Sequence, residues 1–244
     1  MTALLTRKLE AYRYADIDAL ASVWSALAPP ERIAIAAQQK LQQVWLPSDE
    51  AVQVRRAEIA IAQSGGAHLF VLNTASEYGR VELDITLADD AEFTMFGANI
   101  GGGSANLEIV TTVRHVGLRG RSRQSVRSVL GGKAVGTYLG KVEVARGAQQ
   151  TDAEQSVKAM LLDRGAMANC KPELEIFADD VKCAHGASVG ELDADQMFYA
   201  MSRGLDPASA RALLLEGFIM GLWDDAPDGE AIRTAARNAL RAIA

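Results

Sequence analysis

Residues 68–144 form a long series of β-prone runs separated by glycines, with no helical period of useful length between them. In the clearest run, Val81–Leu87, apolar residues alternate strictly with Glu82, Asp84 and Thr86, as a strand with one buried face requires. The absence of helical segments between the runs disfavours βαβ units. The predicted strands are 68–72, 80–87, 92–96, 107–115, 123–130, 134–139 and 141–144. A sandwich, a barrel and a β-solenoid all fit this tract, because no exact repeat is visible.

Helical patterns flank this tract on both sides. Apolar residues at helical spacing between Leu4 and Gln39 predict helices, the third of which begins at Pro30. A strand is predicted over 42–46, whereas 51–63 fits either a strand or a helical turn. We therefore divide the chain into an N-terminal helical segment (1–40), a β core (41–190) and a C-terminal helical domain (191–244).

The C-terminal region shows clear helix start signals. Asp193 is placed to cap one helix, and Asp206-Pro207 begins a second with proline at the first helical position. From Pro207 to Trp223 the second helix is apolar on nearly every side, so it must be covered on several sides. A last helix, Glu230–Ile243, has a single apolar face.

Composition excludes several classes of protein. The 244 residues carry a formal net charge of −6, which argues against nucleic-acid binding. The dense basic run from Arg119 to Arg127 starts with a period of two and is typical of the solvated face of a strand. No apolar stretch reaches the ~18 residues of a membrane span, and the first residues lack the apolar core of a secretory signal. With two cysteines, both expected to be free thiols, a cytoplasmic location without membrane contact is expected.

The stretch Lys171–Glu191 is the main candidate for a functional site. It predicts two short strands joined by a turn at Asp179-Asp180. In the second strand Val181, Cys183 and His185 share one face, because side chains repeat every two residues. A thiolate and an imidazole on one face suit iron–sulfur chemistry, but two ligands cannot hold a cluster, so a partner chain would have to complete the set. The alternative is that Cys183 is a core residue, as free cysteines often are.

Other candidate groups carry weaker signals. We interpret Cys170 as incidental and His115 as a histidine satisfied by turn backbone, since nothing catalytic lies near it in sequence. Gly131-Gly132-Lys133-Ala134 lacks the earlier glycine and the following hydroxyl residue of a phosphate-binding loop, so no bound nucleotide is expected. The sequence contains no serine–histidine–aspartate elbow, no His-Glu-x-x-His and no paired Cys-x-x-Cys, so we do not expect an enzyme.

Residues 171–190, Lys-Pro-Glu-Leu-Glu-Ile-Phe-Ala-Asp-Asp-Val-Lys-Cys-Ala-His-Gly-Ala-Ser-Val-Gly, resemble the signature of SufD-type members of the SufB/SufD family, the scaffolds of the SUF iron–sulfur cluster assembly machinery. The resemblance covers about residues 110–223, and Glu10-Ala11-Tyr12-Arg13-Tyr14 is similar to a short entry motif of the family. It implies a mainly β fold, with a right-handed parallel β-helix core between N-terminal and C-terminal α-helical segments. Typical members are longer, so it also implies a shortened β-helix.

The resemblance further implies a non-catalytic scaffold that pairs with a SufB-like scaffold and recruits a SufC-like ATPase. The strand with Val181, Cys183 and His185 would lie at the junction with SufB. There Cys183 and His185 are candidate ligands of a transient iron–sulfur cluster, which this chain alone would not hold stably. SufC would dock on the C-terminal helices, with Phe198, Arg203, Leu214, Phe218 and Leu222 as candidate residues, the last three also packing on the β core.

Two further classes stay open. The first is a generic β-solenoid module for protein interaction, and the second is a β-helix enzyme that acts on carbohydrate or acyl groups. The sequence shows neither a six-residue aliphatic repeat nor a cluster of acids and bases, which makes the enzyme the weaker alternative.

Overall fold

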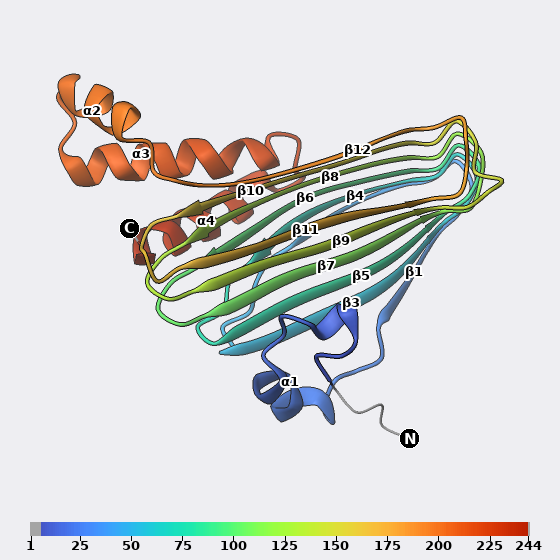
Figure 1. Cartoon of the computed structure of the whole chain (residues 1–244), viewed down its shortest axis with the longest axis horizontal. Coiled ribbons are helices and arrows are strands. Elements are labelled where there is room, and N and C mark those ends of the chain that lie inside the picture. Colours follow the sequence, from blue (N-terminus) through green and yellow to red (C-terminus); the bar gives the residue numbers. More distant parts are fainter. Residues whose placement is uncertain (1–5, 244) are drawn as a thin grey trace.

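The computed structural model describes residues 6–243 and shows a parallel β-helix flanked by helices (Figure 1). One sheet, here named the odd sheet, contains in spatial order β1 (Glu31–Ile35), β3 (Val52–Ile61), β5 (Tyr78–Leu87), β7 (Asn106–His115), β9 (Val135–Val144) and β11 (Met167–Ile176). The even sheet contains β2 (Lys40–Trp45), β4 (Gly66–Asn73), β6 (Glu92–Gly101), β8 (Arg121–Leu130), β10 (Asp152–Leu161) and β12 (Lys182–Glu191). Each rung of the helix gives one strand to each sheet, so the predicted β-helix is confirmed over the sandwich and the barrel.

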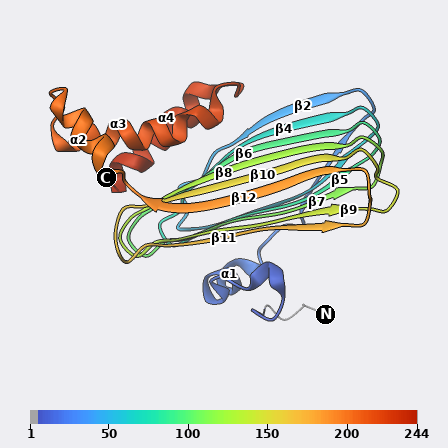
Figure 2. The same cartoon turned by 45° about the horizontal axis from the view of Figure 1, so that its top comes forward.

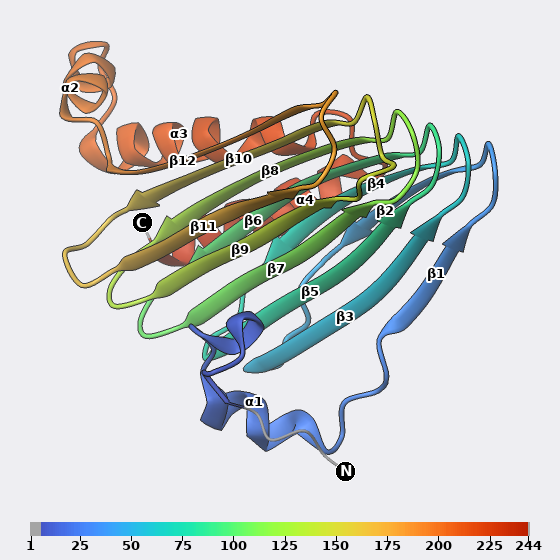
Figure 3. The ribbon, with the colours of Figure 1, turned by 45° about the vertical axis from the view of Figure 1, so that its right-hand side comes forward.

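Neighbouring strands of each sheet lie parallel and side by side (Figure 3). They pair in register, so equivalent side chains stack in columns along the β-helix. Val52 pairs with Tyr78 in an early rung, and Val135 pairs with Met167 in a late one. The second pair is separated by a longer stretch of chain than the first, so the rungs differ in length. Stacking in space therefore produces no fixed period in the sequence, which explains why no repeat is visible.

The corner between the odd and the even strand of each of the first five rungs is built in the same way. One non-glycine residue at each corner has a positive φ, between 55° and 62°. In that conformation its backbone N–H points along the axis of the β-helix and donates to a carbonyl of the next rung. The five residues are Gln38, Ser64, Asp90, Arg119 and Gln150.

The interior between the two sheets is filled by the inward side chains of the strands. Leu69, Leu83, Ile85, Phe93 and Met95 are among those with no more than 1% of their surface exposed. A second apolar layer lies on the outer face of the even sheet. It is closed by the C-terminal helices α3 (Pro207–Ile219), η2 (Met220–Trp223) and α4 (Gly229–Ile243).

The N-terminal segment covers the outer face of the odd sheet, where η1 (Glu10–Tyr12) and α1 (Ile17–Trp24) lie (Figure 1). Beneath it Arg80 is 1% exposed, and its Nη1 lies 2.8 Å from Oε2 of the fully buried Glu108. Arg80 Nη2 donates to the Ala11 carbonyl at 2.8 Å, and the Tyr12 ring centroid is 4.8 Å from the guanidinium carbon. Residues of the entry motif therefore cover the buried ion pair between Arg80 and Glu108.

Several predicted elements need correction. The helix predicted to begin at Pro30 and end near Gln39 is wrong, because β1 begins at Glu31, before the predicted start of the β core at 41. The ambiguous segment 51–63 is strand β3. The runs 134–139 and 141–144 are the single strand β9, in which Gly140 leaves room for the Tyr138 side chain. Strand β10 has no counterpart among the predicted strands.

The predicted C-terminal helices are confirmed. Asp193 caps α2 (Ala194–Ser202) by accepting from the backbone N–H groups of Asp195 and Gln196, and Asp206 caps α3 in the same way. Residues 1–5, which include the predicted helix start at Leu4, lie outside the described residues. Within the residues that are described, no helix is both long and apolar enough to cross a membrane.

Candidate functional site

The last rung of the β-helix, made by β11 and β12, ends both sheets. Among residues 6–243, β11 pairs only with β9 and β12 only with β10, so each strand has one free edge along ten residues. In Figure 2 these two strands lie at the near end of the β-helix, and α2 and α3 extend away from them. Every residue of β12 except Cys183 is exposed. Free edges of this length offer unpaired backbone donors and acceptors to another chain.

Cys183 and His185 occupy inward positions of this last rung. Cys183 pairs in register with Ala153, and His185 pairs with Gln155, and both partners are 1% exposed. The Cys183 side chain is half-buried and packs against the interior, whereas His185 is exposed. Val181, the third predicted residue, is half-buried at the position just before β12. Thiol and imidazole therefore stand side by side at the end of the interior.

Cys170, which sequence reasoning set aside, belongs to the same rung. It lies on β11 in register with the buried Tyr138 and packs against the interior from the odd sheet. The register that brings Cys170 to this rung depends on rung length, so no local sequence signal could have indicated it. Within residues 6–243, no group of three or more His, Cys, Asp or Glu side chains is arranged to hold a metal ion.

Both thiols are protonated more firmly than an ordinary cysteine. Burial raises the pKa of Cys170. Burial also raises the pKa of Cys183, where a hydrogen bond with the Ala153 backbone acts in the opposite direction and Asp152 adds to the rise. Both cysteines are free, as predicted. A metal that bound here would have to displace these protons.

His115, the histidine expected to be satisfied by turn backbone, is instead held by a side chain. The ring is fully buried, and its Nε2 lies 2.9 Å from Oγ of Ser122 on the neighbouring sheet. Burial lowers the pKa of His115 to about 4. This imidazole is a neutral core group of the corner between β7 and β8.

We expect His115 to make the protein sensitive to acid. Its pKa of about 4 in the folded chain is below its ordinary value of about 6.5, so the unfolded chain binds the proton first as pH falls. Above about pH 6.5 the protonation of His115 hardly affects the free energy of unfolding. By about pH 5 it lowers the free energy of unfolding by about 2 kcal/mol. Urea unfolding of the wild type and of His115→Leu at these two pH values checks this. Equal acid losses in the two proteins would contradict it.

The α2–α3 hairpin carries the most exposed large apolar side chains at the C-terminal end. Phe198 is 74% exposed and Tyr199 is 60% exposed, and the guanidinium of Arg203 lies over the Tyr199 ring. Leu213 on α3 is 57% exposed. In Figure 1 this hairpin extends beyond the end of the strands. It is therefore open to a partner on several sides.

The residues predicted to dock an ATPase differ in exposure and form three groups. Phe198 and Arg203 are exposed, whereas Leu214 and Phe218 are half-buried. Leu222 is 3% exposed and belongs to the apolar cluster on the even sheet, which corrects its place in the predicted surface. Tyr199 on α2 and Leu213 on α3 were not among the predicted residues. For Leu213 the reason is that a helix that is apolar on nearly every side does not indicate which side stays uncovered.

Arg127, predicted to be solvated, is half-buried and joins the β-helix to α3. Its guanidinium lies over the Phe218 ring, 5.6 Å from the centroid, and donates to the Phe218 carbonyl. Arg121 and Arg123 of the same strand are exposed, as predicted. The basic run is thus solvated at its start and used for packing at its end.

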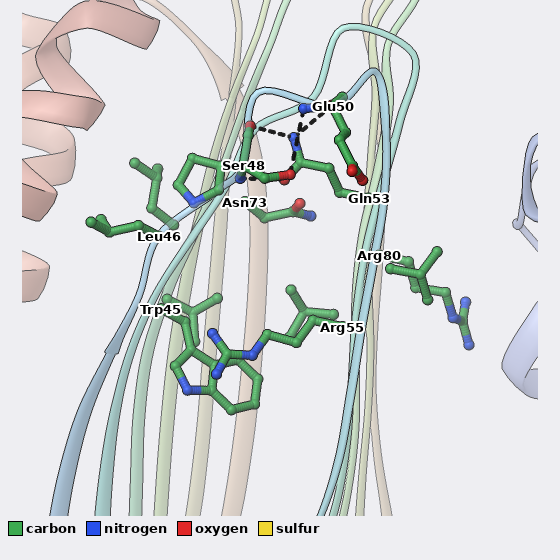
Figure 4. Close-up of a pocket in the computed structure, with 13 residues that line it drawn as sticks. Trp45, Leu46, Ser48, Glu50, Gln53, Arg55, Asn73 and Arg80 are labelled. Atoms are coloured by element: carbon green, nitrogen blue, oxygen red, sulfur yellow. Dashed lines mark hydrogen bonds between the residues drawn. The ribbon is translucent and has the colours of Figure 1, made fainter. Parts of the chain in front are cut away.

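A surface pocket lies beside the first rungs and is lined by residues of β2, β3 and the loop between them (Figure 4). The guanidinium of Arg55 stacks on Trp45 at 3.7 Å from the ring centroid. The amide nitrogen of Gln53 donates to the carbonyls of Ser48 and Glu50 and thereby holds the loop before β3. These polar groups serve the loop structure, so the last rung stays the stronger candidate.

Comparison with known proteins places this geometry in a family. Residues 33–218 match the family model described as SUF system FeS cluster assembly, SufBD core domain. The match begins in β1, so it includes the early rungs that the resemblance over residues 110–223 did not reach.

Three relatives illustrate the range of similarity. An iron–sulfur cluster assembly SufBD family protein of Synechocystis is 33% identical over 181 residues, which cover 74% of this chain and 40% of the relative. Protein ABCI7, chloroplastic, of Arabidopsis thaliana is 42% identical over 128 residues (51% of this chain, 26% of the relative). The iron–sulfur cluster assembly protein SufD of Escherichia coli is 37% identical over 103 residues (42% and 24%). The chain thus matches at most two fifths of the length of these relatives.

Proposed function

Because the chain belongs to the SufBD core family of the SUF iron–sulfur cluster assembly system, we propose that it is a non-catalytic scaffold of SufD type. It presents its last rung to a SufB-like scaffold and its α2–α3 hairpin to a SufC-like ATPase. The observation that carries this proposal is the pair of free ten-residue edges on β11 and β12. The strands β1 and β2 at the other end of the β-helix also have free edges, but these strands are much shorter.

A second β-helix is the partner that fits the edges of the last rung best. Edge strands of this length and regularity are normally shielded, and pairing with strands of another chain satisfies their backbone groups. A rung from a SufB-like chain would at the same time cover the inward side chains of β12, nearly all of which are exposed here. Val189, which is 51% exposed, lies on this surface.

Such a junction would enclose Cys183 and His185 between the two chains. Thiolate and imidazole are both ligands for iron–sulfur clusters, and the remaining ligands would come from the partner. The cluster is the product that the complex assembles, so the ligands of this chain need to hold it only transiently. Cys170, on the facing strand of the same rung, is a third group that the junction would cover.

The α2–α3 hairpin supports the second contact. Phe198, Tyr199 and Leu213 are large apolar side chains that are each more than half exposed. Such side chains on a projecting hairpin favour burial against another protein. No nucleotide, nucleic acid or membrane contact is part of the proposal, and the cytoplasm stays the predicted compartment.

Co-expression with the SufB-like and SufC-like subunits tests the two surfaces against each other. Val189→Asp should weaken recovery of the SufB-like subunit at least about tenfold, because it places a charge in the junction, and should leave the SufC-like subunit bound. Phe198→Asp should have the opposite effect. Each variant is the control for the other, since both side chains are exposed. Recovery of both partners at wild-type levels with both variants would refute the proposal.

Cluster formation in the same complexes separates a ligand role from a purely structural one. His185→Ala should lower the cluster yield while the three subunits still assemble. Cys183→Ala should lower the cluster yield less than His185→Ala does if Cys183 serves mainly in packing. Unchanged iron content in both variants would leave the generic interaction module as the better description.

A further inference from the structure

A chain of buried polar side chains runs through the interior toward the last rung. Oε1 of Gln124 accepts from Thr111 Oγ1 at 2.7 Å and from the Tyr138 hydroxyl at 3.2 Å. The Tyr138 oxygen in turn accepts from Nε2 of Gln155 at 3.1 Å. All four side chains are no more than 2% exposed. These bonds cross between the two sheets and connect two successive rungs.

The direction of these bonds leaves one acceptor free. Tyr138 has a single proton and gives it to Gln124, so its oxygen can only accept from Gln155. Gln155 must therefore turn its amide nitrogen inward, and its Oε1 accepts no hydrogen bond from any residue that the structure describes. A buried carbonyl oxygen without a donor is unfavourable. At the inner end of the chain, Gln124 Nε2 is unpaired in the same way.

The next side chain in this column is His185. Gln124 pairs in register with Gln155, and Gln155 pairs in register with His185, so the three occupy successive strands at one inward position. Neighbouring strands are about 4.8 Å apart, which brings side chains of one column within hydrogen-bonding reach. A thiol is the weaker donor, and Cys183 lies in the neighbouring column above Ala153.

We propose that Oε1 of Gln155 accepts a hydrogen bond from the ring N–H of His185, and that Gln155 thereby determines which imidazole nitrogen faces the junction. The role in cluster assembly rests on the proposed function, whereas the hydrogen bond itself is a property of this chain. Rotation about the side-chain torsions of the exposed His185 makes the bond. The proton is then held on the nitrogen next to Gln155, and the lone pair of the other nitrogen is directed outward to a metal. Gln155 is in this sense a positioning residue.

The test is the tautomer of His185, measured by ¹⁵N NMR on the isolated full chain at a pH where the ring is neutral. The chain has three histidines, so His185→Ala assigns the signal. Gln155→Met, which keeps the volume and removes the acceptor, should change the ratio of the two tautomers about fivefold, the effect of one ordinary hydrogen bond. Gln155→Glu keeps an acceptor and should restore the wild-type ratio.

Thr111→Val is the matched control, because it removes a buried hydroxyl from the same network and leaves in place the Tyr138–Gln124 hydrogen bond that sets the direction of Gln155. Its tautomer ratio should equal that of the wild type. Equal ratios in wild type and Gln155→Met, or equal shifts in Gln155→Met and Thr111→Val, would overturn the inference. Cluster yield in the three-subunit complex is read separately. A tautomer shift without a change in cluster yield would support the hydrogen bond but refute its role in assembly. Failure of the wild-type subunits to associate would refute only the proposed function.

Discussion

Glu108→Gln is expected to lower the free energy of unfolding by about 3 kcal/mol, because it removes the more deeply buried of the two carboxylates that pair with a buried arginine. Arg80 and Glu108 are 1% and 0% exposed, and their closest atoms are 2.8 Å apart. Burial lowers the pKa of Arg80, but the carboxylates of Glu108 and Glu82 outweigh it and raise that pKa above its ordinary value. The guanidinium therefore stays charged in the variant. The measurement is urea unfolding at neutral pH.

An exposed ion pair provides the control for this prediction. Arg32 and Glu58 are 3.2 Å apart with side chains 85% and 50% exposed, so Glu58→Gln should cost less than about 1 kcal/mol. Arg80 also holds the Ala11 carbonyl, so Glu108→Gln should speed trypsin cleavage at Arg13. Similar losses in the two variants would show that the cover over Arg80 does not exclude water.

Leu240→Asp is expected to be the most damaging single change in the C-terminal helices, with a loss above about 4 kcal/mol. Leu240 is 3% exposed and packs, with Ile232 and Ala236, on the outer face of the even sheet. The substitution removes a buried leucine, worth about 1.5–3 kcal/mol, and adds a carboxylate without a partner. Truncation after Trp223 would uncover the same surface. Soluble yield and thermal unfolding measure the effect.

Leu213→Asp is the matched control for Leu240→Asp. It makes the same chemical change on α3 at a side chain that is 57% exposed, so stability should change by no more than about 0.5 kcal/mol. Comparable losses at both positions would mean that the α2–α3 hairpin packs against the chain in solution. That result would also weaken the proposed docking of an ATPase there.

The strands that the local sequence pattern predicted are those whose two faces differ most in hydrophobicity. β5 alternates large aliphatic residues with charged ones, and its prediction is confirmed. β10 was not predicted as a strand, because its inward residues are small or polar and hardly differ in hydrophobicity from the outward ones. These inward residues are Ala153, Gln155, Val157 and Ala159. β1 follows two prolines and contains alanine, so its five residues fit the first turns of a helix equally well.

The local features of this protein follow from short stretches of its sequence. Alternation gave the strand faces, Asp193 and Asp206 marked the helix starts, and Cys183 and His185 were placed on one face of one strand. These features depend on residues within a few positions of one another, where backbone geometry sets the period.

Contacts between residues of different rungs follow from the folded chain and not from local pattern. Gln155 and His185 are in-register partners although a whole rung of chain separates them, and the same holds for Arg80 and Glu108. Cys170 joins the last rung from the opposite sheet. Parallel pairing is non-local, and the corners add different numbers of residues to each rung. Register is therefore set by the packing of whole rungs, which no short segment of the sequence encodes.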